Sequence, residues 1–330
     1  MAGVIGAVRR TVTAPSLSRV TPEGRGFPGG DTPVARRLGA IPQAVVCGFE
    51  WGIADGSPAE TAARLALVAP EARGFAYEGA TMACVIRDAM GPARHRTRAL
   101  LDGAGRPHIL LNHIGIGFAM ARLPRAVWRR AVPRFTEPWA YPRMSWLAVD
   151  GYGFDRAYFD NRRWIDSQHR PRRYAWEGDA EYFPRAVDQG VGRALWFVHG
   201  ARPQDVASAV HRFAFDRRAD LWSGVGLAAT FAGGASASAL SALRDDAGRW
   251  TGHLRQGAVF AAKARHLAGH VPEHTTGATR VLTGLTVEAA AAFADDCGDA
   301  LGPATTGVPV YEQWRTAVRL RSDRFSASQK

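Results

Sequence analysis

The chain has 330 residues, of which 46% are hydrophobic and 22% charged, so it is long enough for a globular core and too apolar to be disordered as a whole. Basic residues number 42 against 30 acidic ones, and the net charge of +12 favours an acidic partner such as nucleic acid, an anionic membrane or an acidic protein domain. Charge alone does not choose among these partners. No stretch approaches the roughly 20 apolar residues that span a bilayer, so we expect no stable membrane insertion.

Residues 1–40 are rich in Arg, Gly, Pro and Thr without periodicity, which predicts an irregular basic N-terminal arm ahead of a single helical domain over residues 41–330. Residues 44–69 are expected to be helical, with an N-terminal cap at Ser57 to Glu60 and a stop at Pro70. Three widely spaced cysteines fit no disulfide framework or zinc spacing, so we expect no metal and a cytoplasmic location.

A short signature of small residues recurs six times along the chain. Its leading glycines are Gly79, Gly115, Gly151, Gly190, Gly224 and Gly257. A second small residue usually follows two positions later and an alanine four positions later, although Asp155 replaces that alanine once. The steps of 36, 36, 39, 34 and 33 residues lie in the range of helix-pair repeats that stack into solenoids.

On a helix, the leading glycine and the alanine share one face, while the second small residue lies nearly opposite. Such a helix can be approached closely by a neighbour on each side. The sequence therefore predicts an all-α, helix-pair repeat solenoid of about six repeats. An irregular all-α bundle, in which the glycines merely permit tight crossings, is the alternative.

Other motifs give little support for known chemistry. The Gly-x-Gly pairs lack the third glycine and the strand of a dinucleotide fingerprint, and no nucleophile elbow, P-loop, zinc protease or kinase motif has usable spacing. His266, His270 and His274 are interrupted by Gly269 and Pro272, so metal binding there is not expected. We predict no cofactor. An aromatic stretch follows the second signature and either lines a pocket or packs between helices: Trp128, Phe135, Trp139, Tyr141 and Trp146.

The residue before each leading glycine defines a further pattern, which we name the polar ladder. Its members are Glu78, Ile114, Asp150, Gln189, Ser223 and Gln256. Five of the six are polar within otherwise apolar helices, so a stack would align them along one surface. Tyr77, His113, Asp188 and Trp222 flank the ladder. Two interpretations stay open: a binding groove, or hydrogen bonds that fix the register between helices.

Glu78 and Asp150 are the candidate catalytic residues, because a partly buried carboxylate can have a raised pKa. The candidate substrate-binding residues are Tyr77, His113, Tyr152, Gln189, Trp222 and Gln256.

Four runs carry a resemblance to a known family: residues 74–80, 150–154, 188–197 and 220–227. They are similar to the UnbL-type proteins, which are encoded beside enediyne polyketide synthases in actinobacteria. The resemblance covers most of the chain after about residue 40. It implies a role in enediyne core maturation but supplies no active-site residues.

The expectation that follows is a protein that acts on or binds a linear polyene or polyyne polyketide intermediate. As an enzyme it would process the polyene; as a scaffold or carrier it would organise the synthase and the other enediyne accessory proteins. An acidic acyl carrier domain of the synthase would be attracted by the arginine excess, and no nucleic-acid partner is expected.

Overall fold

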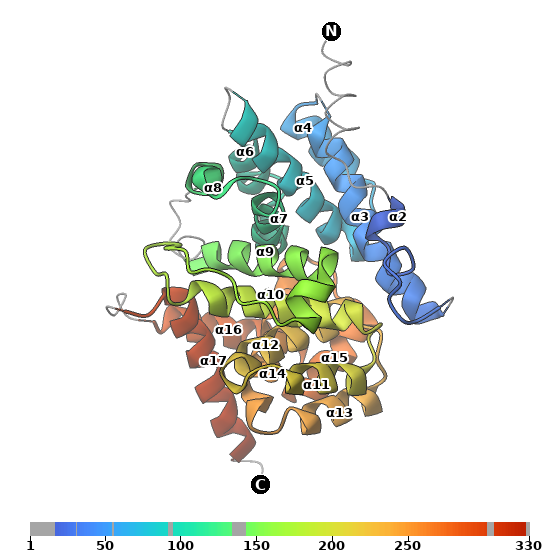
Figure 1. Cartoon of the computed structure of the whole chain (residues 1–330), viewed down its shortest axis with the longest axis vertical. Coiled ribbons are helices and arrows are strands. Elements are labelled where there is room, and N and C mark those ends of the chain that lie inside the picture. The colour runs from blue at the N-terminus through green and yellow to red at the C-terminus, as the bar shows by residue number, and fades with distance from the viewer. Residues whose placement is uncertain are drawn as a thin grey trace.

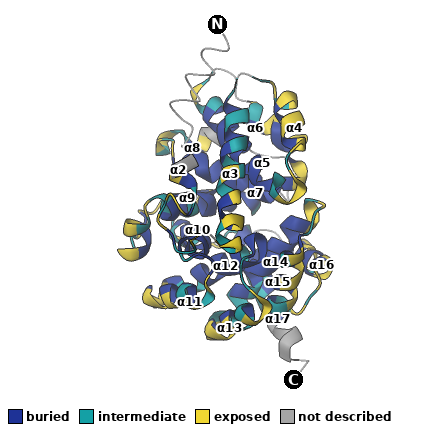
Figure 2. Cartoon of the chain, turned by 90° about the vertical axis from the view of Figure 1, so that its right-hand side faces the viewer, coloured by how far each residue is buried: buried dark blue, intermediate teal, exposed yellow. Residues whose placement is uncertain are grey.

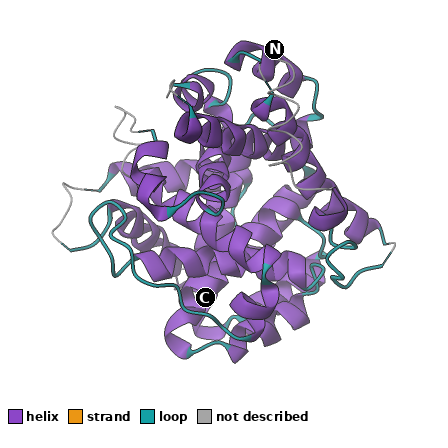
Figure 3. Cartoon of the chain, turned by 45° about the horizontal axis from the view of Figure 1, so that its top comes forward, coloured by secondary structure: helices purple, strands orange, loops and turns teal. Residues whose placement is uncertain are grey.

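The computed structural model describes residues 17–30, 32–54, 56–91, 95–133, 143–301 and 307–327, and in this part of the chain all regular structure is helical (Figure 3). The only β-type pairing among these residues is an isolated bridge between Trp176 and Asp179. The all-α prediction is therefore confirmed.

Six long helices carry the glycine signature, and shorter helices lie between them in the chain. The signature helices are α5 (Pro70–Met90), α7 (Ile109–Met120), α9 (Trp146–Phe159), α10 (Phe183–Val198), α12 (Phe215–Ala232) and α14 (Thr251–Leu267). The short helices are α4 (Pro58–Ala66), α6 (Arg96–Asp102), α8 (Arg125–Ala131), α11 (Pro203–Arg212), α13 (Ala237–Asp246) and α15 (Glu273–Thr283). The remaining helices are α2 (Leu17–Val20), α3 (Pro33–Ile53), α16 (Val287–Asp299) and α17 (Val310–Ala327).

The glycines place the backbones of consecutive signature helices in direct contact. A Cβ atom on Gly190 would lie 1.9 Å from the carbonyl oxygen of Asp150, and one on Gly192 would lie 2.1 Å from that of Leu221. The leading glycine thus touches the preceding helix, and the second glycine touches the following one. The same relation holds for Gly115, Gly117, Gly151, Gly153, Gly224, Gly226 and Gly257. The predicted close approach on two sides is confirmed at these positions.

Ion pairs show that neighbouring signature helices run in the same direction. Near their N-terminal ends, Arg185 of α10 pairs with Asp220 of α12 at 2.9 Å. Near their C-terminal ends, Arg122, just after α7, pairs with Asp155 of α9. Each pair joins residues at similar heights on adjacent helices.

The row of signature helices also returns to its start. Near the end of α14, the Arg265 guanidinium donates to the carbonyl oxygens of Glu71 in α5 and Phe231 in α12, at 2.8 and 2.9 Å. Phe231 meets Phe75 of α5 edge to face, with ring centroids 5.2 Å apart. In Figure 1, α5 and α7 lie above α9 and α10, with α12 and α14 below. The six helices therefore make one turn around a shared interior.

Two helix boundaries differ from the sequence prediction. The predicted helix over residues 44–69 is two helices, because α3 begins earlier, at Pro33, and ends at Ile53. Ser57 caps α4 with Glu60 as predicted, but Pro70 is the first residue of α5, where a proline needs no hydrogen-bond partner for its nitrogen. Helix α3 precedes the signature helices in the row: Gly79 of α5 packs on the Val45 carbonyl, and Gly48 of α3 packs on the Ala76 carbonyl.

Burial separates the two sets of helices. The signature helices are almost entirely buried, whereas α4, α11 and α13 expose one side to solvent (Figure 2). Helix α17 packs against α14 and α16 and inserts the fully buried Arg315. Among the described residues, no helix has the length and apolar character required to cross a membrane.

We predict opposite effects for alanine at two helical glycines. Gly190→Ala forces a Cβ onto the Asp150 carbonyl, so α9 and α10 must separate, and we expect a loss of more than about 3 kcal/mol of unfolding free energy. Gly277→Ala in α15 meets no atom within 4 Å and should gain about 0.5–1 kcal/mol. Urea unfolding of both variants measures this. Equal effects would contradict backbone contact as the cause.

Candidate functional site

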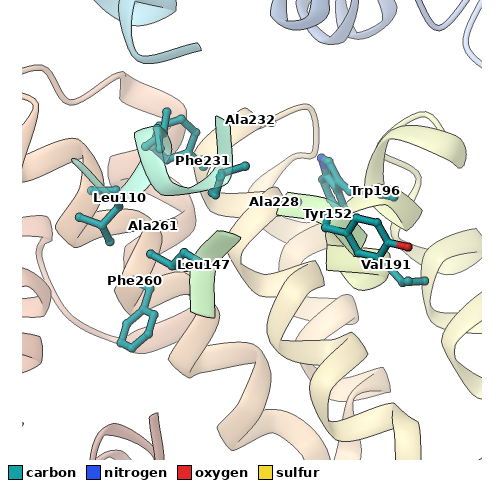
Figure 4. Packing of buried hydrophobic residues seen from close by; sticks show 14 of the residues in the cluster. Leu110, Leu147, Tyr152, Val191, Trp196, Ala228, Phe231, Ala232, Phe260 and Ala261 are labelled. Atoms are coloured by element: carbon teal, nitrogen blue, oxygen red, sulfur yellow. The ribbon is translucent and has the colours of Figure 1, made fainter. Parts of the chain in front are cut away.

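The interior enclosed by the signature helices holds a cavity of about 110 Å³. This volume is of the same order as an engineered apolar cavity of about 150 Å³ that binds benzene. Its walls come from α3 and all six signature helices, with a small contribution from α2. Along α9 the lining extends from Leu147 to Phe159, about 18 Å at the helical rise. Figure 4 shows Leu110, Leu147, Phe260 and Ala261 gathered from three helices on this side of the core.

The signature predicts which side chains face the cavity. The residue three positions after each leading glycine lines it in all six helices: Met82, Phe118, Phe154, Arg193, Leu227 and Phe260. One helical turn later, five of the six equivalent residues also line it: Arg122, Tyr158, Phe197, Phe231 and Ala264. Positions four apart share a helix face, so the glycines that bring the helices together also direct this face inward.

One end of the cavity lies nearest the solvent. Arg122 is exposed there and pairs with the buried Asp155, and Phe159 beside them is half-buried. The segment after α2 is hydrogen-bonded to the end of α9, because Arg25 donates to the carbonyl oxygens of Tyr158 and Phe159, at 3.1 and 2.8 Å.

Glu78 is the acidic residue of the deep cavity wall. Glu78 is only 5% exposed, and no described residue forms a hydrogen bond or ion pair with its carboxyl group. Burial raises the pKa of Glu78 to about 8. The positive charges of Arg193 and Arg265 lower this pKa, and the negative charge of Asp150 raises it further. At neutral pH the group is therefore mostly a carboxylic acid, which can donate a hydrogen bond or a proton.

Arg193 brings a positive charge to the same interior. Its Nε lies 2.8 Å from Oδ1 of Asp150, an ion pair in which these two atoms are not aligned as a hydrogen bond. Its guanidinium stands 4.9 Å from the centroid of the Phe154 ring, and its Nη2 has no hydrogen-bond partner among the described residues. Burial raises the pKa of Asp150, whereas the positive charges of Arg193 and Arg315 lower it.

The remaining polar ladder residues belong to a hydrogen-bonded core beneath the cavity. Gln189 donates to the hydroxyl of Tyr182 and to Asp220, at 3.1 and 3.0 Å. Ser223 donates to Gln256, whose Oε1 also accepts from Arg315 of α17. Gln189, Ser223 and Gln256 thus connect signature helices to one another and to α17, as the register interpretation of the ladder predicted.

Arg315 is the centre of this core. It donates to Tyr182 at 2.9 Å and to Asp220 at 2.8 Å, and it pairs with Glu312 one turn earlier in α17. Burial works against the ionised form of Glu312, but Arg315, Arg185 and Arg319 outweigh it and hold the pKa below its ordinary value. Every charge in the group has a partner, in contrast to Glu78.

Four of the substrate-binding candidates, Tyr77, His113, Tyr152 and Trp222, do not line the cavity. Tyr77 stacks on His108 at 4.7 Å, and Trp222 lies near His211 with centroids 6.0 Å apart. His113 contacts the Ile109 carbonyl at 2.8 Å, and burial lowers its pKa to about 4, so its ring is neutral at physiological pH. Tyr152 packs in an aromatic cluster with Trp128, Trp164 and Phe183.

One cavity residue was not predicted from the sequence, and part of the predicted aromatic stretch lies outside the described residues. Arg193 was not among the candidates, although the signature itself marks it: it is the one charged residue at a position that is apolar in the other five helices. Of the aromatic stretch, Trp128 and Trp146 are buried in the packing, whereas Phe135, Trp139 and Tyr141 lie outside the described residues.

The arrangement offers hydrogen-bond donors to a mostly apolar ligand. Within the described ranges, no three His, Cys, Asp or Glu side chains are grouped as a metal ion would require. The chemistry that the cavity side chains themselves provide is donation by the Glu78 acid and the Arg193 guanidinium.

Fold and cavity together define an all-helical protein that encloses an apolar cavity with a polar inner wall. A family model described as "Protein of unknown function (DUF1702)" matches residues 4–322, and the chain belongs to that family. No curated protein and no solved structure matches it.

The raised pKa of Glu78 predicts a pH-dependent stability. Between its ordinary value of 4.5 and about 8, the folded protein holds a proton that the unfolded chain has released, so the free energy of unfolding falls as pH rises. The stabilisation is complete below pH 4.5 and lost above pH 8. Glu78→Gln should remove a slope of about 1.4 kcal/mol per pH unit in this window.

Urea unfolding at several pH values between 5 and 8 tests this, with Glu273→Gln as the control because Glu273 is exposed. The difference between Glu78→Gln and the unsubstituted protein should grow with pH, whereas Glu273→Gln should follow the unsubstituted curve. A constant difference for Glu78→Gln would show that Glu78 is not protonated in the fold.

Proposed function

We propose that the protein binds a linear polyene or polyyne polyketide chain inside this cavity during maturation of an enediyne core. The supporting observation is the cavity itself: apolar side chains from α3 and the six signature helices line a space of about 110 Å³, and the lining residues of α9 span about 18 Å of helix. Enediyne biosynthesis as the setting rests on the resemblance to the UnbL-type proteins.

Enclosure within helices suits a conjugated chain in two ways. Burial removes its apolar surface from water, which favours binding by about 25 cal/mol for each Å². It also keeps the chain from solvent and from other molecules. We therefore favour a protein that holds the chain, with a scaffold or carrier role toward the synthase and the other accessory proteins.

An enzyme that processes the polyene is the second candidate, favoured by the carboxylic acid of Glu78 against the cavity. A proton donor of this kind can act on a polarisable ligand by general acid catalysis. Incubation of the purified protein with the polyene, alone and with the accessory proteins, separates the two roles. Conversion by this protein alone supports the enzyme.

The regular spacing of the signature helices indicates a repeat architecture. We propose that the six signature helices, five of which are followed by a short α-helix, form the units of a six-repeat solenoid that makes a single turn. The common packing of the leading glycines on the preceding helix supports this view. The acidic acyl carrier domain of a synthase, in the cytoplasm, remains the proposed source of the chain because the protein carries a net charge of +12.

Filling the cavity should abolish binding. Leu227 lines the cavity from α12, so Leu227→Trp places the larger indole side chain in the space. We expect the affinity for a linear conjugated polyene to fall at least about tenfold. Leu67→Trp is the control, because Leu67 is 84% exposed at the end of α4. Fluorescence titration of a polyene measures both.

The same two variants, returned to a strain that lacks the gene, should differ in enediyne production. Leu67→Trp should restore production, and Leu227→Trp should leave the deletion phenotype with an accumulated intermediate. Equal affinity for the polyene in both variants would overturn the cavity as its binding site.

A further inference from the structure

Two buried groups that line the cavity, on Glu78 and Arg193, and a third beside them, on Asp150, have hydrogen-bonding capacity that is not met by the chain. The Glu78 carboxyl group has no partner among the described residues, and neither does Nη2 of Arg193. Oδ1 of Asp150 accepts no aligned hydrogen bond despite its ion pair with Arg193. Buried polar groups in folded proteins are normally satisfied, so unmet donors beside a cavity need an explanation.

Structural necessity does not supply one. In the neighbouring polar core the chain supplies Arg315 with three acceptors, Tyr182, Asp220 and Gln256, although its Nη2 also has no partner among the described residues. Leaving one buried donor unpaired costs about 1–3 kcal/mol. The position equivalent to Arg193 is apolar in the other five signature helices, so the packing of these helices around the interior does not require a charge there.

We propose that Glu78 and Arg193 form a head-group site that accepts the carbonyl oxygen of an uncharged acyl, ester, thioester or ketone group at the end of the bound chain. This inference rests on the proposed function and adds the chemical class of the ligand. It selects an oxygenated chain over a plain hydrocarbon.

The donors determine what the site can take. Protonated Glu78 offers an O–H and Arg193 offers an N–H, and the apolar walls offer no acceptor for either. A carbonyl oxygen has two lone pairs and satisfies both donors at once.

Charge balance determines that the head group is neutral. Asp150 already compensates Arg193, and Glu78 is uncharged while it holds its proton. A ligand carboxylate would add a buried negative charge, which is costly in a low-dielectric interior, and Arg265 does not line the cavity and already donates to two backbone carbonyls. The charged groups that act on Glu78 are Arg193 from α10, Asp150 from α9 and Arg265 from α14, and the pair of Arg122 and Asp155 lies at the outer end.

Three probes with the same chain test the site: parinaric acid, its methyl ester and the matching tetraene hydrocarbon. The unsubstituted protein should bind the ester about tenfold more tightly than the hydrocarbon, and more tightly than the ionised acid. Glu78→Leu should lower the ratio of ester to hydrocarbon affinity, because Arg193 is then the only donor left. Glu78→Gln should keep most of the ratio, because its amide still donates.

A pH series on the unsubstituted protein gives a measurement that does not depend on any variant folding. The preference for the ester over the hydrocarbon should fall as pH rises past about 8, when Glu78 loses the donated proton, and Glu78→Gln should show no such fall.

Each outcome supports or overturns a defined statement. An ester-to-hydrocarbon ratio that is the same in Glu78→Leu and the unsubstituted protein, or the same across the pH series, would overturn the head-group site while leaving the cavity. Tighter binding of the ionised acid than of the ester would overturn the neutral head group. Failure of all three probes to bind would overturn the proposed function, and the head-group site with it.

Discussion

The close approach of helix backbones at the glycines is the constraint on which the rest of the structure depends. A Cβ atom at Gly190 or Gly226 would lie 1.9 Å from a carbonyl oxygen of a neighbouring helix, so no other residue fits without movement of that backbone. Contact on two sides fixes the rotation of each helix about its own axis. That rotation decides which side chains reach the interior, and it is why one position of the signature lines the cavity in all six helices.

The shared interior is divided along its length by chemistry. Toward the N-terminal ends of α10, α12 and α14, polar side chains meet α17, and the charges of Arg315, Asp220 and Glu312 compensate one another. Toward the C-terminal ends, the walls are apolar and remain separated by the cavity. Glu78 and Arg193 lie where the two environments meet, with the energetic cost of buried polar groups but with fewer hydrogen-bond partners than Arg315 has in the lower core.

Much of the fold followed from the sequence, because the glycine signature reports a local requirement that each helix meets in the same way. The all-α class and the two-sided packing could be predicted from it. The flanking candidates Tyr77, His113 and Trp222 could not be placed, since each precedes its ladder residue by one position and is rotated by about 100° onto another helix face. The contact between Gln256 and Arg315 was also beyond prediction, because Arg315 comes from a helix outside the period. Arg193 was within reach, as the charged exception among six equivalent positions.

The lower polar core has a consequence for synthesis on the ribosome. Asp220 and Gln256 enter the tertiary structure before α17 has been translated, because Arg315 follows them in the chain by 95 and 59 residues. During that interval Asp220 has Arg185 as its one guanidinium partner and Gln256 has none, so water must hydrate the oxygens that Arg315 later contacts. The nascent helices therefore cannot reach their final dry packing until α17 has left the exit tunnel and Arg315 replaces that water.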